Sequence, residues 1–126
     1  MIETTMEYKR SDRIADQLHR EIAELVFRRV KDPRVQMVTI TGVEVSKDLQ
    51  HASVFYCVTG KPGEKEKKAV AEGLSNATGF IRQELGKRLH MKHLPQLAFR
   101  YDQSFDYGEK IERLLKEIHK DEQPES

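Results

Sequence analysis

Ser75-Asn76-Ala77-Thr78-Gly79-Phe80-Ile81-Arg82 is the most informative segment of the sequence, because it places an Ala-Thr-Gly tripeptide inside a helical pattern. The apolar spacing of a helix continues across it, so the helix either runs through as one or bends at Gly79. Glycine lowers helix propensity by about 1 kcal/mol relative to alanine, which favours a kink and two helices. The second helix would then begin with free backbone N–H groups, which form an anion site. Taken alone, such a tripeptide is more typical of helix packing.

Helical spacing of apolar residues extends on both sides of this stretch. The pattern predicts one helix from Glu64 to about Asn76 and another from about Phe80, which Pro95 prevents from continuing. The residues expected to be buried are Ala69, Val70, Gly73, Leu74 and Ala77 in the first helix and Ile81, Leu85 and Leu89 in the second. The small residues among them allow close packing.

Two further helices are predicted towards the ends of the chain. The earlier one begins after Ser11, a good N-cap residue, and ends at Asp32-Pro33. Its apolar positions are Ile14, Leu18, Ile22, Leu25, Val26 and Val30. The last helix carries Ile111, Leu114, Leu115 and Ile118 at helical spacing.

Three segments alternate apolar and polar residues as strands do. Residues 38–45 are rich in β-branched side chains, but the alternation slips between Ile40 and Val43, so Gly42 predicts a β-bulge. Residues 51–58 alternate again after a polar turn, which predicts a hairpin. Residues 97–101 form the third predicted strand.

The element order α-β-β-α-α-β-α predicts an α+β two-layer sandwich, with helices on one face of a three-stranded sheet. The 126 residues suffice for one domain, which we place at residues 1–120, followed by a short polar tail at 121–126. We expect a monomer, because the exterior is polar. A lone cysteine, no signal-peptide pattern and no long apolar run favour the cytoplasm and no membrane span.

Charge is unevenly distributed along the chain, although the net charge is only +1. Residues 9–34 hold eight basic and five acidic residues, and residues 76–101 hold five basic and one acidic. Residues 102–126 hold four basic and eight acidic residues. If the fold places the two basic segments together, a polyanion would bind there. The alternative is that each basic run is a solvated helix face.

Signatures of catalysis are absent from the sequence. It has no glycine-rich phosphate loop, no nucleophile elbow and no paired-histidine zinc helix. Cys57 lies within a predicted strand, where a buried thiol is an inert small hydrophobe. His90 and His93 have the spacing to begin a metal site, but exposure or phosphate contact fits them better. Asp102, Ser104 and Asp106 are typical of helix capping more than of acid-base catalysis, so we expect no enzyme, cofactor or metal.

A cationic corner joins the first helix to the first strand. It consists of Arg28, Arg29, Lys31 and Arg34 around Asp32-Pro33. Guanidinium groups suit the geometry of phosphate, but basic residues at a helix C-terminus are also favoured by the helix dipole. Both interpretations remain open from the sequence.

The element order and its small-residue break resemble the type II KH fold, in which a Gly-x-x-Gly loop normally clamps four nucleotides. Ala77-Thr78-Gly79 takes the place of that loop here. With this substitution, several motifs are similar to those of the bacterial ribosome-binding factor A family, in order from about Arg10 to Ile118. They are Asp32-Pro33-Arg34, Val38-Thr39-Ile40-Thr41, Val45-Ser46-Lys47-Asp48-Leu49, Gly79-Phe80-Ile81-Arg82 and the ending Asp102-x-Ser104…Gly108-x-x-Ile111-x-x-Leu114-Leu115.

The resemblance implies a non-enzymatic assembly factor. Such a factor binds the free small ribosomal subunit or its precursor, assists late maturation of the small-subunit rRNA, and is associated with growth in the cold. It also implies RNA contacts at Ala77, Thr78 and Gly79 and along the basic helix that follows. The predicted contacts on that helix are Arg82, Lys87, Arg88 and Lys92. A second set rests on charge alone: Arg10, Arg13, Arg28, Arg29, Lys31 and Arg34.

One departure from the KH pattern changes the expected mode of binding. Alanine replaces the first glycine and the variable pair is missing, so we expect recognition of RNA shape and backbone in place of a nucleotide clamp. An alternative function is a protein-interaction module acting with other assembly factors. A small enzyme using Asp102, Asp106 or His93 is the remaining alternative.

Overall fold

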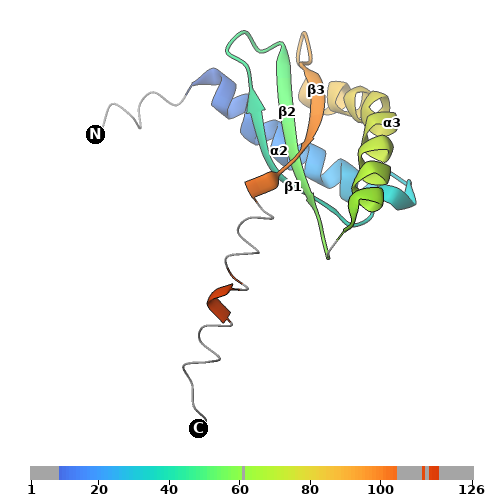
Figure 1. Cartoon of the computed structure of the whole chain (residues 1–126). Helices are drawn as coiled ribbons and strands as arrows, with labels where there is room; N and C mark the ends of the chain where they lie inside the picture. The colour runs from blue at the N-terminus through green and yellow to red at the C-terminus, as the bar shows by residue number, and fades with distance from the viewer. Residues whose placement is uncertain (1–8, 61, 105–111, 113, 117–126) are drawn as a thin grey trace.

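The computed structural model describes residues 9–60, 62–104, 112 and 114–116. The elements are α2 (Arg10–Arg28), the 3₁₀ turn η1 (Pro33–Val35), β1 (Val38–Val45), β2 (His51–Val58), α3 (Glu64–Leu89) and β3 (Gln96–Tyr101). Figure 1 shows the sheet in front of α2, with α3 along one edge. The mixed α+β architecture and its three-stranded sheet are therefore confirmed.

The sheet has the order β1-β2-β3. Strands β1 and β2 form the predicted antiparallel hairpin, and their register shifts between Ile40 and Gly42, so the predicted bulge is confirmed. Strand β3 pairs in parallel with β2, which requires the long crossover that α3 provides. The alternation of apolar residues in β3 puts Leu97, Phe99 and Tyr101 against the core.

The core lies between one face of the sheet and the two helices. Its fully buried side chains come from all three parts of this sandwich. They include Leu18, Ile22 and Leu25 of α2, Val54 of β2, and Leu74, Ile81 and Leu85 of α3, each 0% exposed. Because both helices contribute to one cluster with the inward residues of the sheet, they cover the same face. Cys57 is buried, as expected.

Two predictions about helix boundaries are wrong. The predicted pair of helices around Gly79 is a single helix of 26 residues, α3. The first helix begins at Arg10, and its N-cap is Lys9, two residues before the predicted cap at Ser11. The reason is Asp12, whose carboxylate accepts a hydrogen bond from the Lys9 N–H at 3.1 Å and closes the first turn earlier.

The predicted last helix and the tail at 121–126 lie largely outside the described residues. Of the apolar residues predicted for that helix, Leu114 and Leu115 are described, and they are 50% and 52% exposed. Asp106, which we considered as a candidate acid, also lies outside the described part of the chain.

Candidate nucleic-acid interface

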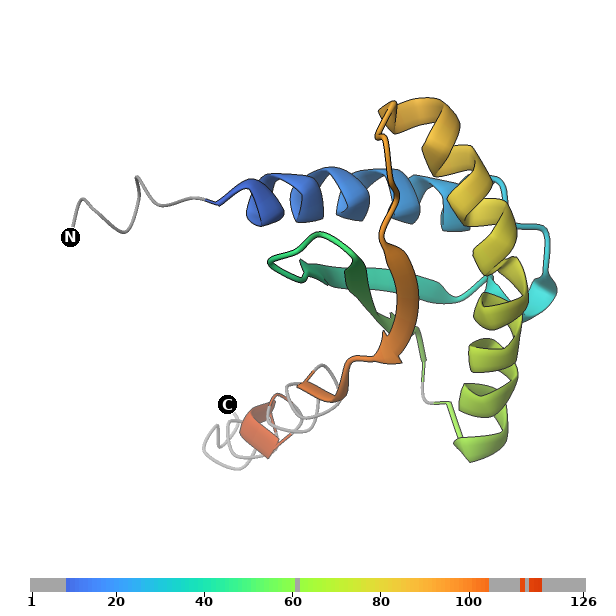
Figure 2. The same cartoon turned by 90° about the horizontal axis from the view of Figure 1, so that it is seen from above.

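The Ala77-Thr78-Gly79 segment lies in the middle of α3 and does not interrupt it. The Thr78 hydroxyl donates a hydrogen bond of 2.9 Å to the carbonyl oxygen of Leu74, one turn back. Hydrogen bonds of this kind often bend a helix, and Figure 2 shows α3 changing direction along its length. The N–H groups after Gly79 remain within the helix, so the predicted anion site at a second helix N-terminus is wrong.

Two glycines on α3 face different surroundings. A Cβ at Gly73 would lie 3.0 Å from Val35 Cγ1 and 3.3 Å from Arg34 Cβ, so Gly73 permits the close approach of α3 to η1. A Cβ at Gly79 would meet nothing within 4 Å. Packing within the described chain therefore explains Gly73 but gives no reason for a glycine at Gly79.

We expect alanine substitutions at these glycines to change stability in opposite directions. Gly79→Ala should raise the free energy of unfolding by about 0.5–1 kcal/mol, because alanine is the better helix former and the space is open. Gly73→Ala should lower it, because overpacking costs about 1–3 kcal/mol against about 1 kcal/mol gained in helix propensity. Urea unfolding of both variants measures the difference. A loss of stability in Gly79→Ala would show that the segment is tightly packed.

A groove opens where the C-terminal end of α2 meets the middle of α3, and we call it the Ala77 groove. Its volume is about 690 Å³. Its lining includes Gly73 together with Arg29, Lys31, Asp32, Asn76, Ala77 and Phe80. The fold thus brings together RNA contacts that were predicted on different grounds. Ala77 was predicted from the family resemblance, and Arg29 and Lys31 were predicted from charge.

The charge of the Ala77 groove is positive. Arg29 is half exposed, with its Nη1 3.7 Å from a Glu84 oxygen and its guanidinium 6.0 Å from the ring centre of Phe80. Lys31 is exposed and has no ion-pair partner among the described residues. The groove also contains Asp32, so its net charge depends on how that carboxylate is held.

The Asp32 carboxylate is occupied by its neighbour. The Arg34 guanidinium donates to both oxygens, at 2.6 Å for the shortest contact, and the Arg34 backbone N–H donates at 2.9 Å. These bonds, the side-chain one first, hold the pKa of Asp32 below its ordinary value. Arg34 is therefore committed to a turn that orders the loop, while Arg29 and Lys31 give the groove its positive charge.

Arg88 was predicted among the RNA contacts of the basic helix, and it lies away from the Ala77 groove. Its Nη1 is 2.9 Å from Glu21 Oε1 and also binds Glu24, so it joins α3 to α2. The hydrogen bond from Arg88, and then its charge, lower the pKa of Glu24. This contribution to stability is present above the unfolded pKa of Glu24 and is lost as the pH falls through its lower folded value.

We expect Arg88→Met to lower the melting temperature, because Glu21 and Glu24 would be left facing each other without a cation. Lys87→Met is the matched control, because Lys87 is exposed and lies 3.5 Å from a single carboxylate, Glu84. Thermal unfolding by circular dichroism at low and high salt measures the effect, which should shrink as salt screens the two acids. Equal melting temperatures for the two variants would contradict a joining role for Arg88.

The remaining predicted cations do not line the Ala77 groove. Arg82, Arg10 and Lys92 line a separate cavity at the far end of α3. Arg13, Arg28 and Lys87 are exposed, and Arg28 lies 5.8 Å from the ring centre of Phe27. The structure therefore does not place all the predicted cations on one surface.

Asp102, His90 and His93 are the described residues among the candidates for catalysis or metal binding. Asp102 accepts a 2.6 Å hydrogen bond from the Thr41 hydroxyl and another from the Ser104 N–H at 3.1 Å. The last helix, which these residues are predicted to cap, lies largely outside the described residues. The described residues hold no group of three metal-ligating side chains around His90 or His93. No helix in the described part of the chain is long and apolar enough to span a membrane.

The chain matches a known protein family over most of its length. The model of a family described as ribosome-binding factor A matches residues 10–115. A ribosome-binding factor A from Syntrophobacter fumaroxidans is 62% identical over 93% of this chain and 100% of that protein. Another, from Geotalea uraniireducens, is 48% identical over 92% of this chain and 93% of that protein. The chain belongs to the ribosome-binding factor A family.

Solved structures of the ribosome-binding factor A family share this fold. The crystal structure of the Thermus thermophilus protein aligns with a TM-score of 0.64 at 27% identity, covering 72% of this chain and 93% of that one. A homology model of the Thermus thermophilus protein, fitted into a cryo-EM map of a complex with the 30S subunit, aligns with a TM-score of 0.58 at 28% identity, covering 71% of this chain and 91% of that one. The first of these matches spans nearly the whole of the solved chain.

Two residues of the Ala77 groove were missed from the sequence. Phe80 was interpreted as the apolar start of a second helix, but it is 37% exposed and lies at the groove beside Arg29. Asn76 was interpreted as a helix end. The signal for both was the continuous apolar spacing, because a helix that runs through places residues 76, 77 and 80 on one face.

Proposed function

We propose that this chain is a non-enzymatic ribosome assembly factor that binds the free small ribosomal subunit, or its precursor, and assists late maturation of the small-subunit rRNA in the cytoplasm. Membership of the ribosome-binding factor A family supports the partner, since a relative has been fitted into a 30S complex. A role in cold adaptation, a monomeric state and a single domain at residues 1–120 are parts of the same proposal.

The observation that carries the proposal is the Ala77 groove. It combines two exposed cations, Arg29 and Lys31, with the exposed ring of Phe80. Next to Phe80 along α3, outside the groove lining, Gly79 leaves the exposed helix surface without a side chain. Phosphates interact with the cations, an unpaired base can stack on an exposed ring, and a bare helix surface allows the RNA backbone to approach closely. We infer that α3 corresponds to the helix pair of a KH fold. One uninterrupted helical turn at Ala77-Thr78-Gly79 then takes the place of the Gly-x-x-Gly loop.

Salt dependence is the first test of the proposed function. The chain should co-sediment with free small subunits and dissociate as the salt concentration rises, because each neutralised phosphate releases counterions. Binding that does not respond to salt, or that is confined to translating ribosomes, would contradict the proposal. Complexes that survive nuclease treatment would favour the alternative, a protein-interaction module.

Gly79→Ala separates binding from folding. We expect the variant to be more stable and to bind free small subunits several-fold more weakly, because the added methyl group occupies the space left for RNA. Ala71→Ser provides a control at another exposed position on α3, away from the Ala-Thr-Gly segment. Undiminished binding by Gly79→Ala in sedimentation would remove the segment from the RNA contact.

A further inference from the structure

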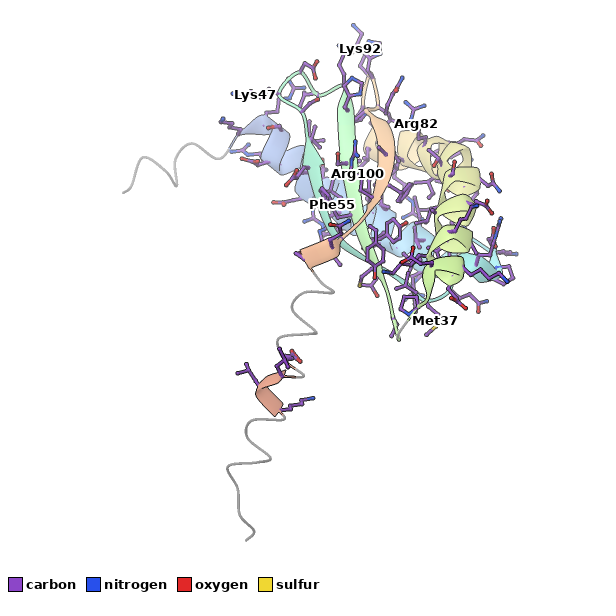
Figure 3. All side chains as sticks on the ribbon, in the orientation of Figure 1. Met37, Lys47, Phe55, Arg82, Lys92 and Arg100 are labelled. Carbon is purple, nitrogen blue, oxygen red and sulfur yellow. The ribbon has the colours of Figure 1, made fainter. Side chains whose placement is uncertain are left out.

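A second cavity lies at the opposite end of α2 from the Ala77 groove, and we call it the end cavity. It has a volume of about 840 Å³, within the size range of small-molecule sites. The start of α2, the loop between β1 and β2, and the loop between α3 and β3 enclose it. Figure 3 shows Lys92 and Arg82 at this end of the molecule, with Met37 at the other.

Cationic and imidazole side chains dominate the polar lining of the end cavity. They are Arg10, Arg82, Lys92, His51, His90 and His93. None of the six has an ion-pair partner among the described residues, and the three imidazoles have no hydrogen-bond partner there either. Six nitrogen-bearing groups with one acidic residue, Asp48, among the lining residues favour an anion.

Arg82 is the fixed group in this cluster. It is half-buried, and its Nε and Nη2 donate to the carbonyl oxygens of Pro95 and Leu94 at 3.3 and 3.2 Å. These acceptors are neutral, so they orient the guanidinium without cancelling its charge. The Nη1 group has no such partner among the described residues, which leaves donors in a fixed geometry for the oxygens of a phosphate.

Asp48 is the acidic residue of the lining. Its Oδ1 accepts hydrogen bonds from the Ser46 hydroxyl at 2.6 Å and from the Gln50 N–H at 3.1 Å. These bonds, the hydroxyl first, lower the pKa of Asp48, so it stays charged. Its Oδ1 is occupied in holding the turn, and the cations of the lining outnumber it.

Apolar side chains also line the cavity. Ile14, Leu49, Met91 and Leu94 lie there, and all four pack on the hydrophobic core. Inorganic phosphate makes no favourable contact with an apolar surface, whereas the face of a nucleobase can pack against it. A smaller hollow, lined by Lys9, Lys47 and Arg10, adjoins the end cavity, because Arg10 and Leu49 line both. In a single-stranded RNA, the next phosphate would lie in this hollow.

We propose that the end cavity binds one unpaired nucleotide, with its phosphate on Arg82, Arg10 and Lys92 and its base against the apolar residues. The nucleotide can be free or part of a single-stranded RNA. The RNA source rests on the proposed function, whereas recognition of phosphate and base does not.

The test follows the imidazole and backbone NMR signals of the isotope-labelled full chain while three probes are added. The probes are inorganic phosphate, adenosine 5′-monophosphate (AMP) and a 5′-phosphorylated penta-adenylate. We expect His51, His90 and His93 to shift together, and AMP to bind about tenfold tighter than phosphate because the base adds apolar burial. His19 is an internal control, since its Nε2 lies 3.1 Å from the Ile40 carbonyl oxygen, outside the cavity.

Variants locate the binding. Arg10→Gln with Lys92→Gln should weaken AMP binding at least about fivefold, since both side chains are exposed and carry no packing role that would unfold the chain. Lys65→Gln with Lys68→Gln, which removes the same charge from exposed positions at the start of α3, should leave AMP binding unchanged. A pentamer at least tenfold tighter than AMP identifies RNA as the source, and AMP as tight as the pentamer identifies a free nucleotide.

Three results would overturn the end-cavity inference. They are equal affinity for phosphate and AMP, shifts of His19 as large as those of the cavity histidines, and no effect of the Arg10 and Lys92 substitutions. Retained co-sedimentation with small subunits in that case would leave the proposed function intact, so the two failures are distinguishable.

Discussion

Replacing Arg29 and Lys31 together by glutamine should weaken binding to free small subunits by about 10–100-fold at moderate salt. Each lost phosphate contact removes one released counterion, so the salt dependence of the binding constant should also flatten, by about 0.7–0.9 in log-log slope per contact. Glutamine is chosen because it keeps the chain polar and does not place a second acid beside Glu84, whose side chain is 13% exposed.

The matched control is Lys65→Gln with Lys68→Gln. Both lysines are exposed at the start of α3, and their replacement changes the net charge by the same amount. Sedimentation at several salt concentrations should show near-unchanged binding for this control. If both double variants weaken binding equally, net charge and not the Ala77 groove determines affinity.

Leu85→Ala should cost about 2–5 kcal/mol of the free energy of unfolding. The Leu85 side chain is 0% exposed, as is Leu74 on the other side of the Ala-Thr-Gly segment. Because α3 is one helix packed on one core, Leu74→Ala should cost a similar amount. The total free energy of unfolding of a domain of this size is about 5–15 kcal/mol, so either substitution should lower the melting temperature by many degrees.

Phe27→Ala is the control for the core substitutions. Its ring is 78% exposed, so its loss should change the free energy of unfolding by less than about 0.5 kcal/mol. Urea unfolding measures all three variants. A much smaller cost for Leu85→Ala than for Leu74→Ala would mean that the second half of α3 is held loosely, as in the two-helix interpretation.

Local patterns predicted most of the fold because they report directly on burial. The slip in alternation at Gly42 predicted the bulge, since a one-residue insertion moves every later side chain to the other face. The continuity of α3 was not predictable from propensity. Gly79 costs about 1 kcal/mol, and this is outweighed by burial of Ile81 and Leu85, at about 1.5–3 kcal/mol for each side chain.

The sequence identified candidate cations one by one, but it did not predict which of them lie together in the folded chain. Charge patterning selected Arg29, Lys31, Arg82 and Arg88 alike, because a sequence does not show which cation meets a carboxylate. The fold pairs Arg88 with two glutamates of α2, places Arg29 and Lys31 at Ala77, and puts Arg82 in the end cavity. These separations depend on how α3 crosses α2, which is a tertiary property.

The central claim, that the Ala77 groove contacts small-subunit RNA, is tested most directly by site-specific photocrosslinking. A benzophenone amino acid replaces Asn76, which is exposed in the groove, or Lys65, which is exposed near the start of α3. Each variant is irradiated on purified free small subunits, and the crosslinked rRNA is isolated. We predict rRNA crosslinks from position 76 and few or none from position 65. Crosslinks from position 65 alone, or to ribosomal protein alone from position 76, would contradict the account.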